Sequence, residues 1–224
     1  GGGGGGEARG TVYTCRVYAR GSPEAKKEST FVTLADPALG IRWPIPLEES
    51  ERSQADLHHP YLRDVVPMQP RRTLVTGCNG QLGRAIRAYA EAHGLTAFEY
   101  TDVGDFDFSD PGAYGGVDWD RYGTSLNAGA YTAVDGAESP EGRTAAWRAN
   151  ATGPALLAAT AREHDLTLVH VSSDYVFDGS RALHDESEPF APLNVYGQSK
   201  AAGDLAVQGA PRHYVLRSSW VIGE

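Results

Sequence analysis

Apolar and polar positions follow two alternating rhythms after residue 71. Short apolar runs rich in β-branched and aromatic residues predict strands in "RRTLVTG", "TAFEYTD", "TLVHVSSD" and "HYVLRSSW", with a weaker strand in "YGTSLNA". Helical spacing predicts helices over 81–94, 140–148, 153–164 and 197–208. The first helix should place Leu82, Ile86 and Tyr89 on one face and stop at Gly94. Because strands and helices alternate, we expect an α/β fold of the Rossmann type, a doubly wound parallel sheet with helices on both faces.

The first 69 residues follow a different pattern. The opening "GGGGGG" cannot pack and is interpreted as a flexible leader, while 11–18 and 29–34 predict short strands. The next stretch contains four prolines and many charges up to residue 64, which predicts an extended connector. We therefore expect a leader, a β or extended appendage and a linker over 1–69, and one dinucleotide-binding domain over 70–224.

Composition narrows the class of protein. The chain has 224 residues, of which 41% are hydrophobic and 22% charged, so it can bury a real core. A net charge of −9 argues against nucleic acid or an anionic membrane surface as a partner. No signal peptide and no apolar run of about 18 residues is present. Two cysteines predict neither a disulfide framework nor a metal site, so a reducing, cytoplasmic location is expected.

A glycine-rich turn follows the first predicted strand of the larger region. Gly77, Gly80 and Gly83 form G-x-x-G-x-x-G between that strand and the helix, so backbone N–H groups and the helix N-terminus can receive a pyrophosphate. Asp102 ends the second strand, where an acid can bind a ribose hydroxyl. The turn predicts dinucleotide binding through Gly77, Asn79, Gly80, Gln81, Leu82 and Asp102. An ordinary tight turn between strand and helix is the alternative.

A tyrosine and a lysine four residues apart supply candidate chemistry. Only three lysines occur in the chain, and Lys200 is the one that follows residue 27. On a helix, Tyr196 and Lys200 share a face, and a nearby cation lowers the pKa of a phenol enough to make it a usable acid. Ser173, at the end of a strand, is the expected hydroxyl partner, since alternation points Ser172 the other way. The alternatives are a surface pair and serines that only start a turn.

The stretch "LNAGAYTAVDGAES" follows another strand. Its small residues leave room for a cofactor close to the backbone, so we expect cofactor contacts from Ala128, Gly129, Ala130 and Tyr131. Asp135 and Glu138 are either substrate contacts or solvated acids at a helix start. Asn150 offers an amide that could bind cofactor or cap a helix.

Taken in order, the glycine turn, "LNAGAYTAVDGAES", "ANATGP", "HVSSDYVFDG", "NVYGQSK" and "LRSSWVIG" resemble the dTDP-4-dehydrorhamnose reductases of the extended short-chain dehydrogenase/reductase superfamily. The resemblance runs through 71–224. It implies a fold that binds NADPH, often also NADH, and that reduces the C4 ketone of dTDP-4-dehydro-L-rhamnose to give dTDP-L-rhamnose. It also implies Tyr196 as proton donor, Lys200 as its partner, and Ser173 where the family usually has threonine.

The resemblance implies further site residues. Asp107 and Phe108 match a pair near adenine, and Trp220 matches a tryptophan at the sugar-nucleotide site. The expected substrate-binding residues are Thr132, Val134, Asp135, Tyr175 and Trp220. The preference for NADPH comes from the resemblance alone, because Asp102 itself favours NADH and Arg84 is the only nearby candidate for a 2′-phosphate. The partner expected is a small nucleotide sugar, and the oligomeric state is not readable.

The first segment has its own resemblance. "VYTCRVY" and "LADPALGIRWPIP" are similar to the carboxyl end of dTDP-4-dehydrorhamnose 3,5-epimerase, which suggests the remnant of an epimerase–reductase fusion. The chain stops where reductases continue into a smaller substrate domain, so reduced activity is expected. Two rival functions stay open: a non-catalytic NADP-binding regulatory subunit, and another epimerase or dehydratase of the superfamily, for which Asp174 could serve as the acid.

Overall fold

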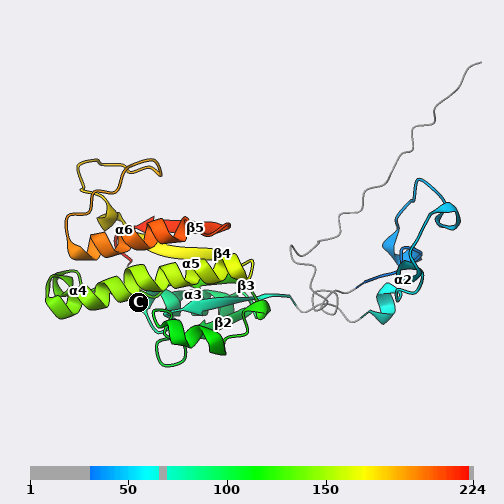
Figure 1. The fold of residues 1–224 in the computed structure, drawn as a ribbon, viewed down its shortest axis with the longest axis horizontal. Helices are drawn as coiled ribbons and strands as arrows, with labels where there is room; N and C mark the ends of the chain where they lie inside the picture. Colours follow the sequence, from blue (N-terminus) through cyan, green and yellow to red (C-terminus); the bar gives the residue numbers. More distant parts are fainter. Residues whose placement is uncertain (1–30, 66–69, 222–224) are drawn as a thin grey trace, which may run out of the picture. The chain divides into compact units, whose positions relative to one another are not determined.

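The computed structural model describes residues 31–65 and 70–221. The chain divides into two compact units, Gly1–Gln69 and Pro70–Glu224, which are described separately below. Figure 1 shows the sheet and its helices in the second unit. Within the described residues, no helix combines the length and the apolar character needed to cross a membrane.

The described part of the first unit is built from turns and short helices. It contains α2 (Gln54–Leu57) and the 3-10 helices η1 (Pro37–Leu39), η2 (Leu47–Glu49) and η3 (Leu62–Asp64). The strand predicted at 11–18 lies outside the described residues. The one predicted at 29–34 is wrong for 31–34, where the chain is irregular and begins a turn at Leu34. The buried carboxylate of Asp36 holds this turn, because it accepts the N–H of Ala38 at the start of η1 at 2.8 Å and the N–H of Leu62 at 2.6 Å.

The second unit contains the predicted parallel sheet. Its strands are β1 (Arg72–Thr76), β2 (Phe98–Thr101), β3 (Tyr122–Asn127), β4 (Thr167–Ser173) and β5 (His213–Ser218). They pair in the order β2-β1-β3-β4-β5, and every pair is parallel. The chain therefore steps outward from β1 in both directions, which creates a topological switch point between β1 and β3. The polar strand β3 is fully formed because neighbours on both sides satisfy its backbone.

Four longer helices connect the strands: α3 (Gln81–Ala92), α4 (Pro140–Trp147), α5 (Gly153–Glu163) and α6 (Val195–Val207). A π-helical turn, Arg148–Thr152, joins α4 to α5, so the two run on almost as one rod in Figure 1. Right-handed crossovers place α3 on one face of the sheet and α5 and α6 on the other. The short 3-10 helices η4 (Pro111–Gly116), η5 (Trp119–Arg121), η6 (Asp135–Glu138) and η8 (Asp174–Val176) fill the loops.

The main core lies between the sheet and α5 and α6. Leu74, Leu157, Leu168 and Val207 are buried there in one cluster. The face predicted for α3 is partly wrong, because its buried residues are Gly83 and Ala90. Tyr89 is 61% exposed and stacks on His93 with ring centroids 4.0 Å apart, so it is not part of the buried face of the helix.

Candidate functional site

A cavity of about 760 Å³ opens at the carboxyl ends of the strands. This size lies within the roughly 300–1,000 Å³ of small-molecule sites, and its place at the switch point is where ligands of doubly wound sheets bind. Its lining comes from the glycine turn, the loop after β3, the ends of β4 and β5, and α6. One cavity therefore joins the phosphate turn to the candidate catalytic residues.

The glycine turn is held by close backbone packing. Gly77 has φ +70°, and a Cβ there would lie 2.4 Å from the Cα of Gly129. At Gly83, a Cβ would lie 2.3 Å from the carbonyl oxygen of Gly77, so α3 can press against the turn. Gly80 is the N-cap residue of α3 and provides no capping side chain, which leaves the helix N-terminus open to the cavity. This cradle fits a dinucleotide pyrophosphate.

Asp102 closes one end of the turn. Its carboxylate accepts the N–H of Asn79 at 2.8 Å and the N–H of Val103 at 2.8 Å, so its position is set by the backbone. Arg84 donates to the carbonyl oxygen of Asn79 at 2.9 Å. An acid and a guanidinium are thus both anchored to the same residue of the turn, and Asp102 lines the cavity.

A second polar cluster lines the cavity near Phe108. Arg148 pairs with Asp107 at 2.8 Å and donates to Ser109 Oγ at 3.1 Å. Ser109 bonds to Asp107 through its N–H and its hydroxyl, and these bonds together with Arg148 lower the pKa of the Asp107 carboxyl although burial opposes them. The ring of Phe108 packs so closely on Gly129 that a Cβ there would lie 2.7 Å from it.

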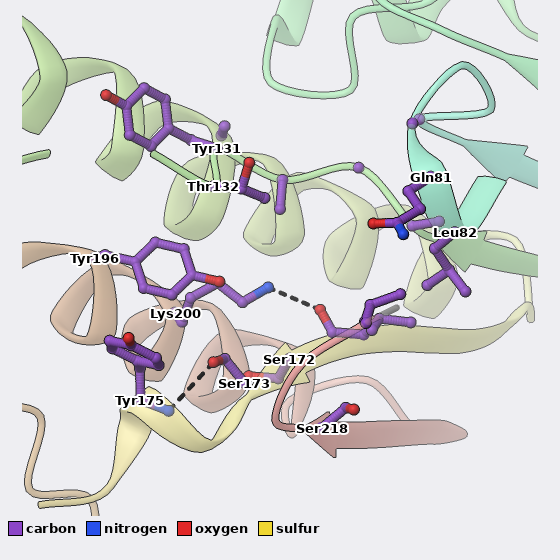
Figure 2. Close-up of a pocket in the computed structure, with 18 of the residues that line it drawn as sticks. Gln81, Leu82, Tyr131, Thr132, Ser172, Ser173, Tyr175, Tyr196, Lys200 and Ser218 are labelled. Atoms are coloured by element: carbon purple, nitrogen blue, oxygen red, sulfur yellow. Dashed lines mark hydrogen bonds between the residues drawn. The ribbon is translucent and has the colours of Figure 1, made fainter. Parts of the chain in front are cut away.

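The helix α6 brings Tyr196 and Lys200 to the cavity. Asn194 caps α6 by accepting the N–H of Gly197 at 2.7 Å, which fixes where the helix begins. Both side chains project from this helix toward the end of β4, where Ser173 lies (Figure 2). The alternation predicted for β4 agrees with the surroundings of its two serines, since Ser173 lies near Tyr196 and Ser172 near Asp204. The Ser173 hydroxyl itself donates to Asp174 Oδ1 at 3.2 Å.

Burial controls the ionisation of this pair. Desolvation raises the pKa of Tyr196, although the hydrogen bond with Ser173 opposes this and Asp174 adds to it. The sequence predicted a lowered pKa for Tyr196, and the prediction is wrong because burial of the phenol outweighs the groups that favour its ionised form. The Lys200 ammonium donates to the carbonyl oxygen of Val171 at 2.7 Å. Lys200 is 2% exposed, and desolvation lowers its pKa to about 8 against the opposing charge of Asp204.

Most of the residues predicted for the site line the cavity. They are Gly77, Gly80, Gln81, Leu82, Asp102, Asp107, Phe108, Ala128, Gly129, Ala130, Tyr131, Thr132, Val134, Ser173, Tyr175, Tyr196, Lys200 and Trp220. Three predicted residues do not line it: Asn79, Asp135 and Asn150. Asp135 is exposed at the start of η6.

Asn150 instead positions a loop that lines the site. It is 1% exposed, and its amide brackets Tyr131 by accepting the N–H at 2.9 Å and donating to the carbonyl oxygen at 3.0 Å. Its Nδ2 also donates to Ser199 at 3.0 Å. The amide therefore connects the π-helical turn to α6 and to the loop after β3. Glu138, the other undecided acid, caps α6 by accepting the N–H of Val195 at 2.9 Å.

Sequence reasoning missed several lining residues. Arg148 is the most informative of them, because no pattern in "RAN" distinguishes a cavity arginine from a solvated one. The others are Val103, Ser109, Ala145, Ala149, Val171, Ser218, Ser219 and Val221. They come from five separate parts of the chain, and only the fold brings them together.

Comparison with known proteins now places the chain. The dTDP-4-dehydrorhamnose reductase of Aggregatibacter actinomycetemcomitans is 36% identical over 156 residues, covering 68% of this chain and 52% of that protein. The enzyme of the same name from Mycobacterium tuberculosis H37Rv is 40% identical over 157 residues, covering 67% and 50%. The chain thus spans about half the length of the curated relatives it matches.

Solved structures agree. A dTDP-4-dehydrorhamnose reductase from Bacillus anthracis, solved in complex with NADP, is 31% identical with a TM-score of 0.64, covering 70% of this chain and 56% of that one. The Clostridium acetobutylicum orthologue is 34% identical with a TM-score of 0.63, covering 68% and 55%. The family model described as the RmlD substrate binding domain matches residues 71–224. This chain therefore belongs to the RmlD family, the family of the dTDP-4-dehydrorhamnose reductases.

Proposed function

We propose that this protein reduces the C4 ketone of dTDP-4-dehydro-β-L-rhamnose to dTDP-L-rhamnose, using NADPH or NADH. One observation carries the proposal: Tyr196, Lys200 and Ser173 line the same cavity as the glycine turn of a dinucleotide-binding sheet. Family membership supports it, since the relatives that match are named for this reaction. Because the chain spans about half of those relatives, activity of these 224 residues is itself part of the proposal.

The bound nicotinamide cofactor would supply the hydride. The chain's own residues would handle the proton and the developing charge. Tyr196 Oη is the proton donor, and its raised pKa keeps it protonated before the reaction. The Ser173 hydroxyl lines the same cavity as that phenol and would bind the substrate oxygen beside it. Lys200 brings a positive charge to a site where burial strengthens it.

The choice between NADPH and NADH depends on two anchored groups. The carboxylate of Asp102 is directed by the N–H groups of Asn79 and Val103 and would accept from the ribose hydroxyls of NADH. Arg84 donates to the carbonyl oxygen of Asn79 in the same turn and would pair with the 2′-phosphate of NADPH. We infer that both cofactors bind, with NADPH favoured by the relative solved with NADP.

The sugar nucleotide would occupy the open side of the cavity, between the loop after β3 and the ends of β4 and β5. The residues proposed to contact it are Thr132, Val134, Tyr175 and Trp220. Trp220 is 84% exposed, so its indole is available to cover a ligand. Residues 1–69 are proposed to be an epimerase remnant joined to the reductase unit of 70–224, and a cytoplasmic location stays a prediction.

The test is a titration of the 224-residue protein with NADPH and with NADH, followed by dTDP-4-dehydrorhamnose. Loss of the reduced-nicotinamide absorbance, with dTDP-L-rhamnose as the product, would establish the reductase. Tight cofactor binding without oxidation would contradict activity of this chain. Extending the protein by the remaining half of a relative then separates a truncated enzyme from a regulatory subunit.

A second candidate has one observation in its favour. Asp174 lines the cavity, and its Oδ1 accepts the Ser173 hydroxyl at 3.2 Å, so an acid lies beside the proposed proton donor as a dehydratase would need. A relative from Streptomyces niveus, named dTDP-4-keto-6-deoxy-D-glucose reductase, is 37% identical over 156 residues, which favours reduction but widens the choice of sugar. Product analysis by mass spectrometry distinguishes the reduced sugar from a dehydrated or epimerised one.

A further inference from the structure

A set of buried polar side chains crosses the sheet beneath the cavity, on the face that α5 and α6 cover. The hydroxyl of Thr76 donates to Asn127 Oδ1 at 2.8 Å, and Asn127 Nδ2 lies 3.1 Å from His170 Nδ1. His170 Nε2 lies 3.7 Å from Asp204 Oδ1, and Arg217 Nε donates to Asp204 Oδ2 at 2.9 Å. These contacts run from β1 through β3 and β4 to α6 and β5.

The backbone determines where the protons of this set lie. The N–H of Gly129 donates to Asn127 Oδ1 at 3.1 Å, and a backbone N–H can only donate. The oxygen of Asn127 is thereby identified, so its amide nitrogen faces His170 Nδ1, which must accept. The proton of the neutral imidazole is then on Nε2, the ring nitrogen on the side of Asp204, although the 3.7 Å between Nε2 and Asp204 Oδ1 is too long for a hydrogen bond. Burial lowers the pKa of His170 well below its ordinary value, with Lys200 adding to the effect, so the ring is neutral near pH 7.

Asp204 is fully buried, and it follows Lys200 by one helical turn on α6. Burial raises the pKa of its carboxyl, but Ser172, Arg217 and Lys200 oppose this and favour the ionised form. In return, the charge of Asp204 is the one influence that opposes the desolvation of Lys200. A buried ammonium in apolar surroundings otherwise loses its proton.

We propose that Asp204, held in place by Arg217 and lying beside the neutral His170, is a positioning residue that keeps the Lys200 ammonium charged and directed at the cavity. The set would also connect Lys200 with the loop after β3, since Asn127 holds the backbone of Gly129 against the glycine turn. The inference deepens the proposed function, and it rests on that function only in assuming that Lys200 assists Tyr196.

The charged and titratable groups around Lys200 come from four elements. Tyr196 and Asp204 are on its own helix. Beneath it, His170 is on β4 and Arg217 on β5. From η8, Asp174 and Tyr175 act on Tyr196. Of the groups on the buried side, Asp204 alone is negative, so removing its charge should lower the pKa of Lys200.

The scarcity of lysine makes a direct measurement possible. The chain has three lysines, and Lys26 and Lys27 belong to the other unit. With lysine labelled with ¹³C at Cε, the Lys200 resonance can be assigned by its loss in Lys200→Met, and its pKa followed by NMR. In Asp204→Asn the Lys200 pKa should fall by about one unit or more, the lower end of the effect of a close opposite charge. Asp204→Glu, which restores the charge, should recover most of the wild-type value.

A matched control is Asp165→Asn, which removes an exposed carboxylate paired with Arg212 at 2.8 Å and should leave the Lys200 pKa unchanged. An unchanged Lys200 pKa in folded Asp204→Asn would overturn the proposal. If that variant does not fold, Asp204→Leu/Arg217→Met decides, because replacing both members of a buried ion pair by apolar residues is usually tolerated. In this double variant the Lys200 pKa should still be lower than in wild type, although by less than in Asp204→Asn. A Lys200 pKa equal to that of wild type would overturn the proposal as well.

The NMR titration needs neither substrate nor turnover. A Lys200 pKa that depends on Asp204 in a chain without reductase activity would keep this inference and reject the proposed function. Reductase activity in a protein whose Lys200 titrates independently of Asp204 would reject this inference and keep the proposed function.

Discussion

Lys200 and Tyr196 show how far burial changes the chemistry of single residues. On an exposed helix, a tyrosine and a lysine four positions apart would both titrate near pH 10. Here desolvation acts on both, raising the pKa of Tyr196 and lowering that of Lys200 to about 8. The pKa of Tyr196 therefore lies above that of Lys200, the reverse of their usual order, and Lys200 changes charge just above neutral pH.

Replacing Tyr196 by Phe should lower the rate of ketone reduction by about 100-fold or more, because the proposed proton donor is lost while the ring is kept. The Kd for NADPH should change less than about threefold, since no part of the glycine turn is altered. Stopped-flow absorbance and cofactor fluorescence measure the two quantities. Tyr214→Phe, on the exposed face of β5, is the control and should retain full activity. Parallel loss of turnover and binding would mean that Tyr196 is structural.

The neutral His170 predicts a loss of stability in acid. The unfolded chain binds a proton at this residue below about pH 6.5, whereas the folded protein does so only at much lower pH. The unfolded state therefore holds more protons in that window, and the free energy of unfolding should fall as the pH falls, by up to about 1.4 kcal/mol per unit. Urea unfolding between pH 7 and 5 measures this.

His170→Gln should flatten that profile, since glutamine keeps an acceptor for Asn127 but does not titrate. His93→Gln is the matched control, because His93 stacks on Tyr89 at an exposed site and should leave the slope as it is. An equal slope in wild type and His170→Gln would show that some other group controls the acid response.

At the scale of elements, the turn between β1 and α3 depends on contacts from outside itself. Gly77 and the loop after β3 approach so closely that their backbones exclude a Cβ. Sequence patterns predicted β1, α3 and the glycines between them, because strand and helix periodicities are local. They did not predict that Gly77 packs on Gly129, since β2 and β3 lie between the two glycines along the chain and only the pairing of β1 with β3 brings them together.

Gly77 and Gly94 form a natural comparison. Both have positive φ, +70° and +64°, but nothing lies within 4 Å of a Cβ at Gly94. Gly94→Ala should cost only the strain of that backbone conformation, about 1–2 kcal/mol. Gly77→Ala should cost more than that, and it should weaken cofactor binding by displacing the loop at Gly129. Urea unfolding and NADPH titration of both variants test this, and equal costs would mean that the close packing is not what requires glycine.

At the scale of the whole molecule, the cavity belongs to one of the two units of the chain. All the residues that line the cavity belong to the unit Pro70–Glu224. That unit also contains the sheet and every helix that covers it. The described residues of the first unit contribute none of the cavity lining.

A protein of residues 70–224 should therefore bind NADPH with a Kd within about twofold of that of the full chain. The physical reason is that binding energy depends on the lining and on its preorganisation, which this unit supplies by itself. Isothermal titration calorimetry of both proteins checks the prediction. A large loss of affinity in the shorter protein would show that residues 1–69 support the site, and circular dichroism would establish whether it had folded.

Sequence alone determined the order of strands and helices, the glycine turn, the Tyr196–Lys200 pair and the family resemblance. All of these depend on spacings of a few residues, which local periodicity encodes. The errors were also local: the strand predicted at 31–34 is an irregular stretch leading into a turn before Asp36, and Tyr89 lies outside the packed face of α3. At Asp36, a contact with the distant Leu62 accompanies the turn, whereas Tyr89 stacks on His93 one helical turn away.

Tertiary structure alone decided the environment of the site. It brought Arg148 to the cavity, left Asp135 outside it, and buried Asp204 and His170 beneath Lys200. It also reversed the expected shift of the Tyr196 pKa. Burial and the distances between charges depend on segments far apart in the chain, and ionisation responds to those quantities more than to neighbours in sequence.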